Sequence, residues 1–150
     1  MVNELTTKKQ ILIKIKSMLQ SEIDGMLQIY NIKSKSRIID IIISNFCKLN
    51  KKVKIKFYKD NIDILNEEYD IDRKGLYIRN DTYAAIKENK KLFIISTNNK
   101  PQNRKERNIN QYELINLSIY YFILLSADEQ KEIIDNYSKE RAEKIRLLNI

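Results

Sequence analysis

Residues 10–47 read QILIKIKSMLQSEIDGMLQIYNIKSKSRIIDIIISNFC and contain the patterns that decide the fold. From Ile11 to Lys16, isoleucine alternates with leucine or lysine, which predicts a short strand with one apolar and one largely basic face. Apolar residues then recur every three or four positions to about Asn31. This spacing predicts an amphipathic helix that Ser17 can cap.

A second helix is predicted after the polar segment from Lys33 to Ser36, which breaks the period and supplies hydroxyl caps. From Ile38 to Leu49 this helix is nearly all apolar, so it has to be buried on most sides. A unit of about 40 residues offers nothing to bury it against. The unit therefore requires a partner chain or a second copy of itself.

This order of strand, helix, capped turn and buried helix resembles the ribbon-helix-helix DNA-binding superfamily, the family of the Arc and MetJ repressors and the CopG-like regulators. The most specific part is Ser34-Lys35-Ser36-Arg37-Ile38-Ile39, which is similar to the family's Ser-Arg-Ser-Glu-Leu-Ile type of entry into its second helix. The chain departs from the family pattern at Lys16-Ser17, where a Pro or acidic cap is usual, and at Asn31, where Gly is common.

The resemblance implies that two ribbons pair antiparallel across a two-fold axis and lie in the major groove of DNA. Carried over by position, the outward ribbon residues that would touch base edges are Gln10, Leu12, Lys14 and Lys16. The residues around the start of the second helix would hold phosphate, namely Lys33, Ser34, Lys35 and Ser36. The alternatives are a solvated strand face for the lysines and simple helix capping for the serines.

A weaker second copy begins after Gly75, with an alternating segment over residues 76–80 and a helix start at Asp81. After an inserted stretch, residues 108–115 resemble the Asn-Gln-Tyr-Ile style of second helix in the same superfamily, and a long apolar helix follows. In this repeat interpretation residues 11–16 pair with 76–80 inside one chain, and Tyr77 and Arg79 point outward toward bases. The result would be a pseudo-two-fold monomer that reads an asymmetric site.

The competing interpretation gives the chain one ribbon-helix-helix unit, which dimerises between chains. Both interpretations divide the chain into an N-terminal DNA-binding unit (1–50), a structured linker (51–74) and a third part (75–150). The third part is either the second ribbon-helix-helix-like unit or a helical oligomerisation unit. In the linker, the alternation of Val53, Ile55 and Phe57 predicts another strand.

The polar run from Thr97 to Asn108 contains the single Pro and predicts a loop. Its candidate backbone-contacting residues are Arg104, Lys105, Arg107 and Asn108. The alternative is a solvated connector. The last segment starts with a capping box at Ser126 and continues as a charged amphipathic helix, which either packs on its own domain or docks a protein partner.

Composition narrows the function further. The chain has no His and a single cysteine, Cys47, so it lacks a His-based triad, a His-ligated metal site and a cysteine zinc site. The net charge is +8, and the whole excess lies in residues 1–60, with 13 Lys and Arg against 5 Asp and Glu. This excess favours an anionic partner. Neither a signal peptide nor a membrane span is predicted, which favours the cytoplasm.

The sequence therefore predicts an α+β, mainly helical protein with a short antiparallel two-stranded ribbon and a C-terminal helix. It predicts a non-enzymatic, cofactor-free regulator that binds double-stranded DNA as a homodimer or pseudo-dimeric monomer, such as a repressor of its own operon. Alternatives on the same scaffold are an antitoxin and a plasmid partition or relaxosome component. From other classes, an oligomerising adaptor that binds an acidic protein and an RNA binder also stay open.

Overall fold

The computed structural model describes residues 7–69, 74–96 and 106–148, and within them the chain is mainly helical with small antiparallel sheets. The elements in the first half are β1 (Lys8–Ile13), α2 (Ser17–Ile29), α3 (Lys35–Lys48), α4 (Lys51–Asp60) and the 3-10 helix η1 (Ile62–Asn66). The second half holds β2 (Lys74–Arg79), α5 (Asn80–Lys90), β3 (Ile94–Ser96), β4 (Glu106–Asn108), α6 (Gln111–Ile123) and α7 (Ala127–Leu148). The predicted α+β class is confirmed. No helix among the described residues is long and apolar enough to span a bilayer.

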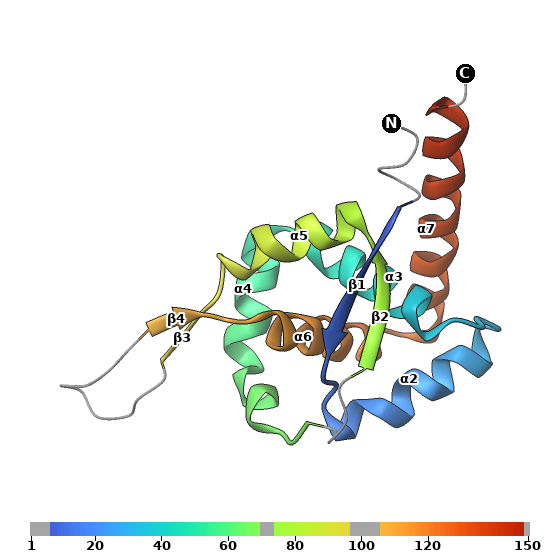
Figure 1. The fold of residues 1–150 in the computed structure, drawn as a ribbon. Helices are drawn as coiled ribbons and strands as arrows, with labels where there is room; N and C mark the ends of the chain where they lie inside the picture. The colour runs from blue at the N-terminus through green and yellow to red at the C-terminus, as the bar shows by residue number, and fades with distance from the viewer. Residues whose placement is uncertain (1–6, 70–73, 97–105, 149–150) are drawn as a thin grey trace.

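Strands β1 and β2 pair antiparallel inside one chain, with Lys8 opposite Arg79 and Ile13 opposite Lys74. Figure 1 shows this ribbon lying across the helices. Its inner face consists of Ile11, Ile13, Leu76 and Ile78, which are at most 5% exposed. The pairing predicted between the two copies is therefore observed, although it covers 8–13 and 74–79 rather than 11–16 and 76–80.

Helices α3 and α6 pack on one another behind the ribbon and form the centre of the core. Each buries most of its middle turns, as the apolar run after Ser36 predicts for α3. The second helix of the N-terminal unit thus finds its partner within the same chain.

The two central helices correspond residue by residue at a spacing of 76. Ser34 and Asn110 are their N-caps, and each side chain accepts a hydrogen bond from the backbone N–H three residues on. Six residues further, both helices carry a buried polar side chain, Asp40 in α3 and Asn116 in α6. Phe46 and Phe122 follow at matching positions and are both inaccessible to solvent.

Helix α2 ends at Ile29 with Tyr30 as its C-cap, and Asn31 lies in the turn that follows. Asn31 has a φ of 54°, which lies in the left-handed region that asparagine tolerates better than most residues. The residue therefore performs the turn that glycine would, and α3 begins a few residues later.

Three local predictions are wrong. Residues 51–60 form helix α4 rather than a strand, because Asn50 caps a helix there and Lys54 and Tyr58 are buried one turn apart. Ser17 is the first residue of α2 and does not cap it, since the N-cap is Lys16. The predicted loop over residues 97–108 is wrong at its end, where residues 106–108 form strand β4 and pair with β3, while residues 97–105 lie outside the described part of the chain.

The predicted units do not have separate cores. Tyr58 of α4 and Ile64 of η1 belong to the same hydrophobic cluster as the ribbon, α3 and α6. Helix α7 begins with the predicted capping box at Ser126 and Glu129 and packs on α3. Leu147 and Leu148, near its end, are about half exposed, at 55% and 45%.

Candidate nucleic-acid interface

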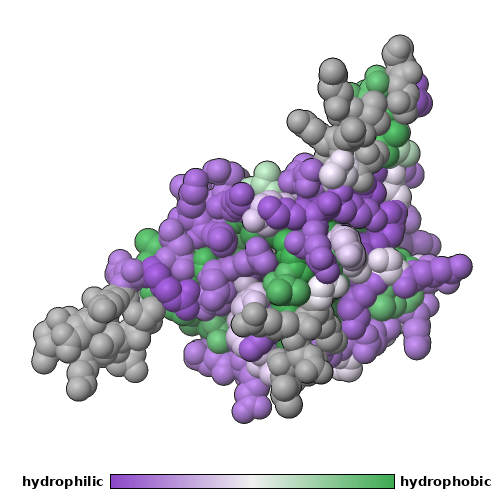
Figure 2. Space-filling model, in the orientation of Figure 1, coloured by the Kyte–Doolittle hydropathy of each residue, from purple (hydrophilic) through white to green (hydrophobic). Residues whose placement is uncertain are grey.

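The solvent-facing side of the β1–β2 ribbon carries Gln10, Leu12 and Tyr77. Leu12 is 50% and Tyr77 53% exposed, and Gln10 lies directly opposite Tyr77 in the register. The side chain of Gln10 extends across Gly75, where a Cβ atom would lie only 2.9 Å from the Gln10 amide nitrogen. Figure 2 shows a small hydrophobic area on this face, bordered by hydrophilic residues. The ribbon therefore presents one amide and two large apolar groups in a polar setting.

The first turns of α3 and α6 lie against opposite edges of the ribbon. Ser36 Oγ accepts a hydrogen bond from the Tyr77 N–H at 3.0 Å, and Gln111 Nε2 donates to the Leu12 carbonyl at 3.3 Å. Each central helix thus begins beside the strand of the other half. Helix N-termini carry unpaired N–H groups and a partial positive charge. The exposed ribbon face is consequently flanked by the N-termini of the two central helices.

The two helix starts differ in charge. The first turn of α3 has no acidic residue, and Lys33, Lys35 and Arg37 surround its Ser34 cap. Lys35 also forms an ion pair with Asp24 at 3.3 Å. We conclude that the start of α3 is the more favourable of the two for a phosphate group.

The start of α6 is stabilised by its own carboxylate. Glu113 accepts a hydrogen bond from the Asn110 N–H in a capping box and binds the Arg107 guanidinium through both oxygens, at 2.6 and 3.1 Å. Burial alone would raise the pKa of Glu113, but the hydrogen bonds from Arg107 and Asn110 outweigh it and lower that pKa below its ordinary value. The guanidinium of Arg107, which was a predicted phosphate contact, is therefore bound to Glu113 in this structure.

Glu113 makes the free energy of unfolding depend on pH in the acid range. Because its pKa is lower in the folded than in the unfolded chain, its contribution is complete above pH 4.5 and is lost as the pH falls through the folded-state value. We expect Glu113→Gln to remove this part of the acid dependence, measured by urea unfolding at several pH values between 2 and 6. An unchanged dependence in the variant would show that other carboxylates account for it.

Lys16 does not face outward from the ribbon, although its predicted base contact requires that position. The strand ends at Ile13, and Lys16 turns inward with none of its surface exposed. Its Nζ donates to the carbonyls of Leu65 and Glu67 at 2.9 and 2.7 Å and lies 3.6 Å from the centre of the Tyr69 ring. Burial lowers the pKa of Lys16. This lysine ties the segment after η1 to the base of the ribbon.

The other residues predicted to contact DNA differ in how far they are exposed to solvent. Arg79 is only 14% exposed and turns away from the outward face, toward Asp40 and Tyr137. Lys14 lies beyond the end of β1 and is half-buried. Among the remaining predicted phosphate contacts, Lys33, Ser34 and Asn108 are exposed. Lys35 and Ser36 are part-buried. Arg104 and Lys105 lie outside the described part of the chain.

Sequence reasoning missed two lysines at the start of the ribbon. Lys8 and Lys9 are both exposed, and the Lys9 ammonium lies 4.2 Å from the centre of the Tyr83 ring. The isoleucine alternation starts only at Ile11, whereas strand β1 begins three residues earlier, at Lys8. By contrast, much of the basic excess of residues 1–60 lies on α4 rather than at the ribbon, at Lys51, Lys52, Lys56 and Lys59.

The arrangement as a whole is a solvent-facing antiparallel ribbon between two helix N-termini, with basic residues along one side. A two-stranded ribbon of this kind fits the major groove of B-DNA, which is about 12 Å wide. Comparisons with protein-family models, curated proteins and solved structures found no match. The ligand of this surface therefore has to be inferred from its own residues and geometry.

Proposed function

We propose that this protein is a sequence-specific DNA-binding regulator of the ribbon-helix-helix type, in which one chain supplies both halves of the ribbon. The observation that carries the proposal is the intrachain pairing of β1 with β2, with Gln10, Leu12 and Tyr77 facing solvent. The crossed contacts of α3 and α6 with the ribbon edges add support, because in each half the start of a central helix contacts the strand of the other half.

The chemistry of the outward face suits base edges in the major groove. The Gln10 amide can pair with adenine N6 and N7, and Leu12 can contact the methyl group of thymine. Lys33 and Lys35 beside the α3 N-terminus supply a sequence-independent grip on phosphate. We therefore expect the ribbon to determine which sequence is bound and the start of α3 to supply much of the binding affinity.

The two halves differ in sequence, so we expect the DNA site to be asymmetric. Gln10 stands opposite Tyr77, and the acid-free start of α3 stands opposite the Glu113-containing start of α6. A homodimer would present the same residues twice and would read a palindrome. A repressor of its own operon fits this activity best, and an antitoxin or a plasmid accessory protein would use the same surface.

Selection of bound duplexes from a random pool tests the proposal. We expect one enriched motif with the parent protein and a relaxed motif with Gln10→Ala, because alanine cannot pair with a base edge. Gln28→Ala, an exposed glutamine near the end of α2, is the matched control and should leave the motif unchanged. No enriched motif with the parent would overturn the proposal and favour an adaptor that binds an acidic protein.

A further inference from the structure

Arg79 occupies an outward position of the ribbon but does not face outward. Leu76 and Ile78 point into the core and Tyr77 points to solvent, so by strand alternation the Arg79 side chain starts on the exposed face. It nevertheless turns toward the body of the protein, where its Nε donates to the Tyr137 hydroxyl at 3.3 Å and lies 3.9 Å from Asp40 Oδ2. Its 14% exposure reflects this turn.

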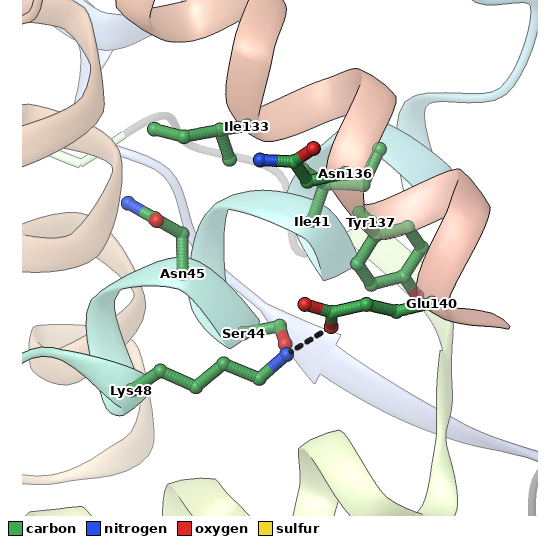
Figure 3. A pocket seen from close by; sticks show the side chains of 8 residues that line it. All are labelled: Ile41, Ser44, Asn45, Lys48, Ile133, Asn136, Tyr137 and Glu140. Carbon is green, nitrogen blue, oxygen red and sulfur yellow. Dashed lines mark hydrogen bonds and ion pairs between the residues drawn. The ribbon is translucent and has the colours of Figure 1, made fainter. Parts of the chain in front are cut away.

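Two of the groups that hold Arg79 come from α3 and α7, namely Asp40 and Tyr137. The Tyr137 hydroxyl donates a hydrogen bond to Asp40, and both residues are buried. Burial and the charge of Asp40 raise the pKa of Tyr137 to about 12, so the hydroxyl keeps its proton at working pH. Figure 3 shows α3 and α7 side by side at an open pocket. The volume of this pocket is about 150 Å³. The Lys48–Glu140 ion pair joins the two helices there at 2.9 Å.

In the other half of the protein, the described residues place no carboxylate at the position equivalent to Asp40. At the position equivalent to Asp40, Asn116 is neutral and binds backbone groups of the first half, the Lys14 carbonyl and the Lys16 N–H. Asp40 instead faces a cationic side chain and the hydroxyl of Tyr137. The charge at position 40 is therefore one difference between the two central helices.

We propose that Asp40 and Tyr137 restrain Arg79, so that the free protein withholds one cationic side chain from the DNA and binds with less than its full affinity. The inference rests on the proposed function. Rotation of the Arg79 side chain about its own bonds would return the guanidinium to the outward face near Lys8, where it would contact the duplex. Such a rotation has to break the interaction with a buried carboxylate, which opposes DNA binding.

Asp40→Asn is the test, because it removes the charge, keeps the shape and copies the residue found at the equivalent position 116. We expect the variant to bind the selected duplex roughly tenfold more tightly, about the effect of one good arginine contact. In an Arg79→Ala background the same substitution should change nothing. Arg79→Ala alone should change the affinity by less than about twofold, since the restrained side chain contributes little. Affinities are measured by fluorescence anisotropy.

Three results would overturn the proposal. An equal gain from Asp40→Asn with and without Arg79 would mean a general effect of net charge. A large loss from Arg79→Ala alone would mean that Arg79 already contacts DNA in the parent, and this arm stays informative even if Asp40→Asn does not fold. Unchanged or weaker binding by a folded Asp40→Asn variant would also contradict it. Failure of the proposed function is recognised separately, because the parent would then bind no selected duplex.

Discussion

Replacing Asn116 with alanine is expected to destabilise the protein by about 3 kcal/mol, since it leaves several buried polar groups without partners. The Asn116 side chain accepts from the Lys16 N–H at 2.7 Å and donates to the carbonyls of Lys14 and Tyr112 at 2.8 and 2.7 Å. It thus fastens the junction between β1 and α2 to α6. Without it, the backbone at the end of the ribbon loses its partners in the other half of the chain.

Ser118→Ala is the matched control for this variant. Ser118 is as fully buried as Asn116 on the same helix, but its hydroxyl donates to the Leu114 carbonyl one turn earlier. Loss of this local bond should cost no more than about 1 kcal/mol. Urea unfolding followed by circular dichroism gives both values. Equal costs for the two variants would show that Asn116 does not hold the two halves together.

Reversing the charge of Lys33 and Lys35 is expected to weaken DNA binding on the order of 100-fold at low salt, because two phosphate contacts become repulsions. The loss should be nearly the same for all duplexes, since these lysines would hold the backbone and not the bases. It should also shrink as the salt concentration rises.

Lys56→Glu with Lys59→Glu is the control for the charge reversal. Each pair of lysines is solvent-accessible and contains one member in an ion pair, Lys35 with Asp24 and Lys56 with Asp60. The net charge of the two double variants is identical, so a general field effect would weaken both equally. Anisotropy titrations at two salt concentrations distinguish the outcomes. Equal losses would mean that the start of α3 is not the phosphate site.

Local periodicity predicted the elements that form the candidate site. Alternation from Ile11 identified the ribbon, and the run after Ser36 identified the buried helix, because each pattern reflects which face meets the core. The pairing of residues near 11 with those near 76 followed from recognising a second copy. The same comparison could have gone further, since the spacing of 76 that relates Ser34 to Asn110 also relates Asp40 to Asn116.

Long-range contacts set the orientations of the Lys16 and Arg79 side chains, which the sequence periodicity did not predict. The alternation continues to Lys16, but the Lys16 N–H donates a hydrogen bond to Asn116, 100 residues away in the sequence, and the Lys16 side chain is buried. The backbone of Arg79 continues the strand alternation, but its side chain turns away from the outward face. There it meets the Asp40 carboxylate and donates a hydrogen bond to the Tyr137 hydroxyl. Asp40 and Tyr137 are both far from Arg79 in the sequence, as Asn116 is from Lys16, so no local pattern could indicate these contacts.

The number of chains on one DNA site tests the central proposal most directly. Native mass spectrometry of the complex with the selected duplex should show one chain per duplex, and the selected motif should lack two-fold symmetry. That result is expected because β1 and β2 of a single chain already complete the ribbon. Two chains on a single palindromic motif would contradict the account, since the ribbon would then have to form between chains.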